Sequence, residues 1–346
     1  ACFGVIFAEK ILLLLGTDPD VMHLSLPYVQ WMLAGSPLIF IYIIYTSILR
    51  GVGDSTTALF ASALTIGVGL VVTPVLIAGY FGFPKMGIIS PAIATILGNI
   101  AVLLFLALYL NYKQHPLKLD WALLKHIRHH PGLSKIILRL GIPTGVQMIT
   151  TSAAGLVIVG LVNRYGAEAT AAYGAVNQVL NYIQFPALSI AIAASVFGAQ
   201  AIGAGKNDLL NKVTRTALSM NILFTGSLVV LAYLFSKYLM ALFITDSQVV
   251  VLGQQLLFIV LWSILFFGAS AIFASIMRAS GTVTVPMIIN IIAIIAIEVP
   301  AAYLFSHWWG LQGIWYGYAL AFVCLCIMQG LYYQFVWKKK TIEALI

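Results

Sequence analysis

Long apolar runs separated by short polar stretches dominate the pattern of this chain. Nine runs are long enough to cross a bilayer, because a transmembrane helix needs about 20 predominantly apolar residues. A shorter run at 1–16 precedes them and reads as an incomplete span. Each run should be helical, since a backbone in lipid must satisfy its own hydrogen bonds. The nine full runs lie near 26–49, 57–80, 87–110, 140–163, 170–198, 213–235, 249–276, 284–306 and 312–336.

The composition distinguishes a soluble protein from a membrane protein. Of the 346 residues, 62% are hydrophobic and 8% are charged, and the mean hydropathy is +1.03. A soluble domain carries about 25% charged residues, so the sequence predicts an all-α integral membrane protein. The three cysteines lie inside apolar runs, which argues against a disulfide framework. Cys324 and Cys326 would project to different helix faces, so no metal site is expected from them.

A repeat relates the front of the chain to its second half. Thr17-Asp18 corresponds to Thr245-Asp246, and at the same offset Ser47-Ile48-Leu49-Arg50 corresponds to Ser275-Ile276-Met277-Arg278. Gly53 then falls on Gly281. The apolar composition of the chain does not explain why polar residues match between the two copies at a fixed spacing. Such repeats are typical of transporters built from two related halves.

The repeat defines three segments: a first lobe at 1–110, a polar linker at 111–139 and a second lobe at 140–346. The second lobe holds six spans, whereas the first holds four, one of them cut short. The sequence thus predicts a two-lobed bundle with ten visible spans of an expected twelve. We expect about two and a half spans, on the order of 90–100 residues, to precede the visible chain.

Basic residues predict the orientation. Most of the 18 Lys and Arg lie on one set of alternate loops, including the linker and Lys338 to Lys340. The positive-inside rule places this set and the C-terminus in the cytoplasm. The net charge of +8 is therefore an orientation signal, and no nucleic-acid partner is expected. Within the linker, Trp121 to Arg139 predicts an amphipathic helix at the inner membrane surface. Its His126, His129 and His130 lack the further ligands that a zinc site requires.

Several short motifs follow the spans in a fixed order. Arg50-Gly51-Val52-Gly53-Asp54 resembles the R-G-x-G-D motif of the MATE (multidrug and toxic compound extrusion) transporters, and Arg278-Ala279-Ser280-Gly281 looks like its weaker second copy. The stretch from Gly198 through Gln200, Gly203 and Gly205 is similar to the family's G-Q-x-x-G-A-G loop. Leu140-Gly141-Ile142-Pro143, Ala171-Ala172-Tyr173-Gly174 and Val299-Pro300-Ala301-Ala302-Tyr303-Leu304 also fit the family.

The resemblance implies an antiporter that exchanges H+ or Na+ for small organic, often cationic, drugs. It implies no other cofactor, a multi-pass protein of the cell (inner) membrane and a monomer in the bilayer. The cavity of the family lies between two six-helix lobes and opens alternately to each side. This chain departs from the family pattern at Ala58, which replaces a Pro, and at Thr73 and Thr151, which replace acidic residues of some members.

One acidic residue, Glu298, lies well inside a span. A charge at the bilayer centre costs at least about 2.5 kcal/mol, and intramembrane acids are functional by default. We therefore expect Glu298 to face a cavity, where it would couple ion movement. The alternative is that its side chain caps backbone groups freed by Pro300. Both interpretations stay open at this point.

The span 170–198 carries a polar stripe. Asn177, Asn181 and Gln184 share one helix face by their spacing, with Gln178 and Tyr182 flanking it. Such a stripe lines a wet cavity or joins helices by hydrogen bonds of about 0.6 kcal/mol each. We expect cavity lining, with Gln147 and Thr151 of the preceding span as further candidates.

The motif residues have a structural role in this interpretation. Arg50 and Arg278 lie at cytoplasmic helix ends, where cations favour the helix dipole and anionic headgroups. Gly53, Gly203 and Gly205 permit tight turns, and a phosphate loop at 203–206 lacks the required glycine spacing. The alternatives are a lipid-linked flippase of the same superfamily, which would want basic residues in mid-span, and an inactive truncated membrane protein. A channel should show pore-lining charge rings, and no constellation for an enzyme is visible.

Overall fold

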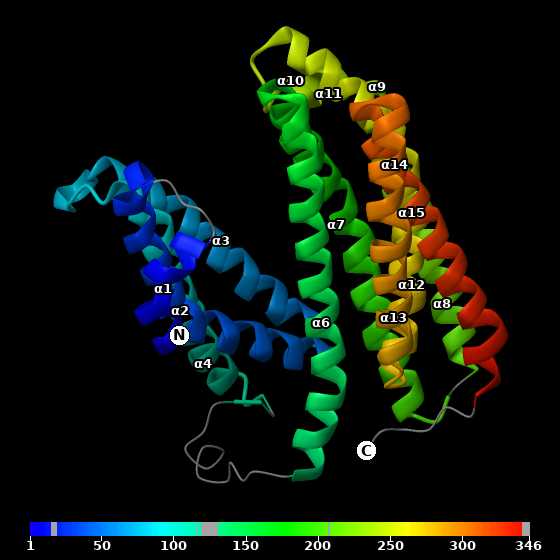
Figure 1. Ribbon diagram of the computed structural model, residues 1–346. Coiled ribbons are helices and arrows are strands. Elements are labelled where there is room, and N and C mark those ends of the chain that lie inside the picture. Colours follow the sequence, from blue (N-terminus) through cyan, green and yellow to red (C-terminus); the bar gives the residue numbers. More distant parts are fainter. Residues whose placement is uncertain (15–18, 116, 119–130, 207, 341–346) are drawn as a thin grey trace. The chain divides into compact units, whose positions relative to one another are not determined.

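The computed structural model describes residues 1–14, 19–115, 117–118, 131–206 and 208–340 (Figure 1). Within these ranges all regular structure is helical and no strand occurs. The chain divides into two compact units, Ala1–Arg128 and His129–Ile346, referred to as unit 1 and unit 2. The division falls inside the 111–139 linker.

Unit 1 is an antiparallel set of apolar helices. Its α-helices in the described ranges are α1 (Cys2–Leu14), α2 (Pro19–Gly51), α3 (Ser55–Ala78) and α4 (Ser90–Tyr112). Helix α3 packs along α4, and α2 packs against both α1 and α4. Because Ala58 and Ala61 are small, α3 can approach its neighbours closely, and both are buried with Leu49, Val102 and Leu106.

Unit 2 contains the longer helices. They are α6 (Pro131–Val162), α7 (Ala167–Gly203), α8 (Leu209–Met220), α9 (Gly226–Leu234), α10 (Ser236–Ala241), α11 (Ser247–Val260), α12 (Ile264–Ala279), α13 (Thr284–Ile292), α14 (Val299–Trp309) and α15 (Leu311–Leu331). Helix α7 packs along α12, and α14 packs along α15. The largest core of the unit joins α7 and α11 to Trp315 of α15.

Nine helical segments of the described residues are long and apolar enough to cross a membrane. They coincide with the nine predicted runs to within about five residues, except that the segment predicted at 140–163 begins at Pro131, so the predicted helical membrane fold is confirmed. Helix α1 has 13 residues and is too short to be counted with them.

Three of these segments are interrupted by π-helical turns that the periodicity does not predict. One π turn (Asn221–Thr225) joins α8 to α9, a second (Ala293–Glu298) joins α13 to α14, and a third (Tyr332–Val336) follows α15. The second lies just before Pro300, whose ring and missing N–H disturb the preceding turn of a helix. Such turns are frequent at functional sites because they re-aim the side chains around them.

The linker differs in part from the predicted interfacial helix. Residues 131–139 form the first turns of α6 and continue directly into its membrane-spanning part. Pro131 is the first residue of α6, a position where the missing N–H of proline costs nothing. The remainder at 119–130, with Trp121, His126, His129 and His130, lies outside the described residues, as does Thr17-Asp18.

Candidate functional site

A cavity of about 490 Å³ lies inside unit 2, and Glu298 lines it. Its walls come from α6, α7, α12, α15 and the α13–α14 segment. Apolar side chains dominate the lining, and none of the described residues that line it is basic. The lining residues are Gln147, Met148, Thr151, Ser152, Leu188, Phe267, Asn290, Ala293, Ile294, Glu298, Ala321, Phe322 and Leu325.

Glu298 is the acidic residue of this cavity. Its side chain is half-buried, and among the described residues no ion pair or hydrogen bond to its carboxylate occurs. It lies within electrostatic range of the Tyr318 hydroxyl, which is within hydrogen-bonding distance of the Tyr173 hydroxyl (3.1 Å). A carboxylate without a counter-charge in a membrane segment is costly, so this site favours binding of a cation or a proton.

The alternative role for Glu298, capping of α14, has no support in the geometry. Glu298 occupies the position before the first residue of α14, but its side chain makes no capping hydrogen bond there. The π turn ends at this residue, and the side chain contributes to the cavity wall instead. The prediction that Glu298 faces a cavity therefore agrees with the structure, whereas its role in ion coupling stays a prediction.

Two candidate cavity residues of α6 line the same cavity as Glu298. Gln147 and Thr151 are one helical turn apart and both line the cavity, together with Ser152. The Thr151 hydroxyl donates to the Gln147 carbonyl oxygen (3.0 Å), so both of its lone pairs are available to accept hydrogen bonds. Thr151 is uncharged, and the acidic residue of the cavity comes from another helical segment.

Asn290 is a cavity residue that the sequence does not single out. Its Oδ1 atom is buried and has no hydrogen-bond partner among the described residues. In a regular α-helix, residues eight apart such as Asn290 and Glu298 differ by about 80° around the axis. The wider π turn between them changes this angle, and both side chains line the same cavity. A buried oxygen without a donor costs about 1–3 kcal/mol, so a donor group on a ligand would be favoured here.

The polar stripe of α7 lies outside this cavity. Leu188 is the α7 residue that reaches the cavity, and Asn177, Asn181 and Gln184 share its helix face by their spacing. Asn177 donates to the Tyr173 carbonyl (3.1 Å), which is a bond within its own helix.

The two flanking residues of the stripe do not join the cavity either. Gln178 is exposed. Tyr182 lines a different, apolar cavity of about 380 Å³ with residues of α9 and α10. Of the stripe and its flanking residues, only Tyr182 lines one of these two cavities, and it is not the cavity of Glu298.

The two copies of the family motif form the same turn. Arg50 Nη2 donates to Ser47 Oγ (3.2 Å), and Arg278 Nη2 donates to Ser275 Oγ (3.3 Å). The next glycine in each copy, Gly53 (φ 91°) or Gly281 (φ 78°), has a left-handed conformation. Glycine adopts this conformation without a steric penalty. The backbone N–H of each glycine donates to the carbonyl of its arginine, at 3.0 Å in the first copy and 2.9 Å in the second.

Other motif residues have comparable roles. Gly51 ends α2, and Gly203 ends α7. Gln200 accepts from the Ala204 N–H through its carbonyl oxygen, and Gly205 has a φ of 68° in the turn that follows. These residues therefore shape helix ends, as expected of structural loops. In the described part of the chain no group of three His, Cys, Asp or Glu is arranged to hold a metal ion.

The first copy of the motif differs from the second at Asp54, which makes both a capping contact and a charge contact. Its Oδ1 accepts from the Thr57 N–H (3.0 Å), and its Oδ2 lies 3.7 Å from His115 Nε2. Partial burial raises the pKa of Asp54, but the Thr57 hydrogen bonds and the nearby His115 and Lys113 outweigh it, so the pKa is below its usual value.

Replacing Asp54 with Ala should lower the stability of unit 1 by about 1 kcal/mol, the usual cost of losing an N-cap. Because the folded-state pKa is depressed, the stabilisation is present above the unfolded pKa of about 3.9 and lost as pH falls through the folded value. Thermal unfolding in detergent at pH 7 and pH 3 measures it. Asp208→Ala is the control, since Asp208 precedes α8 without a side-chain cap. An equal loss at both pH values would contradict the role of the charge.

Comparison with known proteins gives consistent matches over most or all of the chain. A family model described as MatE matches residues 1–75 and 143–304. A probable multidrug resistance protein of Bacillus subtilis, YoeA, is 43% identical over 100% of this chain and 75% of its own length. A probable multidrug resistance protein of Thermotoga maritima, NorM, is 27% identical over 84% of this chain and 62% of its own length.

Solved structures show the same fold. The bent form of the Vibrio cholerae MATE transporter VcmN has a TM-score of 0.84 and 20% identity, over 96% of this chain and 74% of its own. An outward-facing multidrug resistance transporter of the MOP superfamily has a TM-score of 0.87 and 21% identity, over 95% of this chain and 73% of its own.

Proposed function

The chain belongs to the MATE family, and on that premise we propose that it exports small organic, often cationic, molecules in exchange for H+ or Na+. The observation that carries the proposal is Glu298, a carboxylate without a partner among the described residues, in a membrane-spanning helix that lines a cavity of drug-like size. Ligand sites commonly measure about 300–1,000 Å³. The protein acts as a transporter and not as an enzyme.

Exchange follows from competition for one negative charge. A coupling ion or an organic cation can neutralise the Glu298 carboxylate, and binding of one weakens binding of the other. Because coupling free energies between two ligands are reciprocal, the ion that displaces the drug is itself displaced by the drug. Alternation of the site between the two sides of the membrane then converts an ion gradient into export.

The rest of the cavity supports binding of varied substrates. The Phe267 and Phe322 rings, with centroids 5.1 Å apart, offer faces to an organic cation. Met148 is a flexible, polarisable neighbour of the kind found at promiscuous surfaces. Gln147 and Asn290 can each accept or donate a hydrogen bond. Few of these contacts demand one substrate shape.

We place the protein in the plasma membrane as a monomer, with the linker and C-terminus in the cytoplasm. The basic cluster Lys338 to Lys340, after the last span, supports this orientation. Anionic lipids of the cytoplasmic leaflet attract such residues.

Transport by the purified protein in liposomes tests the proposal. We expect a fluorescent lipophilic cation to move against its own gradient when a pH gradient or a Na+ gradient is imposed, and the effective gradient identifies the coupling ion. An ionophore that collapses this gradient should stop transport, and protein-free liposomes give the background. If neither gradient changes the dye distribution, the proposed antiport is wrong.

A further inference from the structure

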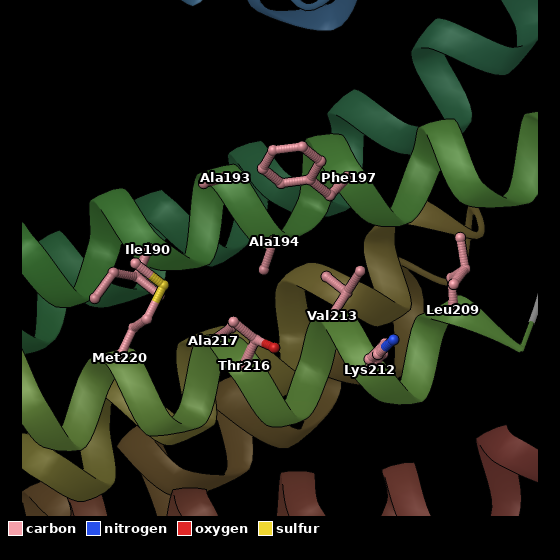
Figure 2. A pocket seen from close by; sticks show the side chains of 10 residues that line it. All are labelled: Ile190, Ala193, Ala194, Phe197, Leu209, Lys212, Val213, Thr216, Ala217 and Met220. Atoms are coloured by element: carbon pink, nitrogen blue, oxygen red, sulfur yellow. The ribbon is translucent and has the colours of Figure 1, made fainter.

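A second cavity of unit 2 is separate from the Glu298 site. This groove of about 340 Å³ lies between α7 and α8 (Figure 2). Its α7 residues, such as Ile190 and Phe197, lie on the face of the helix opposite to Leu188, which lines the Glu298 cavity. The lining residues are Ile190, Ala193, Ala194, Phe197, Leu209, Lys212, Val213, Thr216, Ala217 and Met220.

The groove is polar at one end and apolar at the other. Lys212 lies toward the end with Leu209 and Phe197, near the α7–α8 loop, whereas Ile190 and Met220 form the far end (Figure 2). The distance along α7 from Ile190 to Phe197 is roughly 10 Å, at 1.5 Å per residue. The groove therefore has the shape and polarity of a site for one end of an amphiphile.

The lysine at this end is free to bind an anion. Lys212 is exposed, and among the described residues it forms no ion pair, although Asp208 precedes it by one helical turn. Its end of the unit is basic. Gly198 of α7 is adjacent to Ala279, which ends α12 and follows Arg278. Helices α7 and α12 therefore end on the same side of the unit, with Lys206 and Arg215.

We propose that this groove binds an anionic glycerophospholipid of the adjoining leaflet, with an acyl chain along the groove and the phosphate at Lys212. Charge complementarity selects this occupant, because Lys212 would repel the organic cations of the transport site. A membrane-spanning protein meets such lipids at every exposed face, and anionic lipids are concentrated in the leaflet that basic residues face. The inference rests on the membrane-spanning helices and not on the transport proposal.

Another cavity beside α7 provides an internal comparison for the groove that contains Lys212. The apolar cavity of about 380 Å³ that contains Tyr182 lies on the same side of α7, toward its other end, and is lined by Val179, Ile183 and residues of α9 and α10. None of the described residues that line it is charged. It offers an acyl chain a similar surface without a partner for a phosphate, so headgroup preference should be confined to the Lys212 groove.

Native mass spectrometry tests the headgroup contact. Protein from vesicles with equal amounts of phosphatidylglycerol and phosphatidylcholine should retain phosphatidylglycerol preferentially. Lys212→Gln should reduce this preference about fivefold, the factor expected from one lysine near a phosphate. Lys212→Arg should preserve it, and Arg215→Gln, which removes a charge from α8 outside the groove, should change it little. Equal losses in the Lys212 and Arg215 variants would mean diffuse surface attraction and would overturn the proposal.

Photo-cross-linking tests the acyl-chain contact independently. A benzophenone side chain in place of Phe197 should cross-link to the acyl chain of phosphatidylglycerol in preference to phosphatidylcholine. The same group in place of Tyr182 should cross-link both lipids alike. Phe197 and Tyr182 are 60% and 56% exposed, so neither replacement should disturb the fold. Absence of lipid cross-links at Phe197, or equal preference at both positions, would show that the groove is not the anionic lipid site.

Discussion

Replacing Glu298 with Gln is expected to abolish gradient-driven export of organic cations while leaving the protein folded. Glutamine keeps the size and shape of the side chain but binds neither a proton nor Na+ as a carboxylate does. A ligand that binds two conformations with equal affinity does not shift the equilibrium between them. Without the Glu298 carboxylate the cavity no longer binds the coupling ion, so the ion gradient cannot drive transport. The expected loss of efflux is at least tenfold, equivalent to about 1.4 kcal/mol.

Controls separate a coupling role from a structural one. Removing an unpaired charge from a membrane segment relieves a cost, so the Glu298→Gln variant should unfold at the same or a higher temperature. Glu298→Asp keeps the charge and should retain part of the export. Glu168→Gln is the matched control, because Glu168 is exposed in the first turn of α7 and outside the cavity. Unchanged efflux in folded Glu298→Gln protein would rule out Glu298 as the coupling residue.

The helical spans could be predicted because a bilayer imposes one simple requirement on sequence. An apolar run of sufficient length has to be helical, and its neighbours set only the details. The twin turns at Gly53 and Gly281 were predictable for a similar reason. A fixed Ser-x-x-Arg-x-x-Gly spacing encodes its own local hydrogen bonds, which depend little on tertiary packing.

The candidate site was only partly predictable. Glu298 is an unusual residue for a membrane span, so hydropathy alone marks it, whereas Thr151 was singled out by the family resemblance; both line one cavity. Asn290 was missed because its burial without a hydrogen-bond partner and its place in the cavity wall depend on tertiary packing, and no periodicity signals the π turn between it and Glu298. The cavity role of the α7 stripe stays a prediction, because a shared helix face does not say which neighbour covers it, and the one bond seen for Asn177 is within its own helix.

Close packing of α14 on α15 holds the helix segment that presents Glu298. Gly313 and Gly317 are four residues apart on α15, the spacing of small residues that lets membrane helices approach closely. A Cβ atom on Gly313 would overlap the Phe305 carbonyl of α14 and lie 2.5 Å from the Ser306 nitrogen. A Cβ atom on Gly317 would lie 2.7 Å from the Ala302 nitrogen. These obstacles are backbone atoms, which cannot rotate away as a side chain can.

Gly313→Ala should therefore force α14 and α15 apart and cost about 1–3 kcal/mol or more, the range for overpacked interiors. The matched change Gly160→Ala, in α6 with no atom within 4 Å of the added Cβ, should be neutral or slightly stabilising, since Ala favours a helix over Gly by about 1 kcal/mol. Thermal unfolding and the monodisperse fraction in detergent measure both variants. Transport by Gly313→Ala should fall with its folded fraction, because α14 follows directly from Glu298. Equal stability of the two variants would mean that the helices separate without cost, and that their close contact does not position the carboxylate.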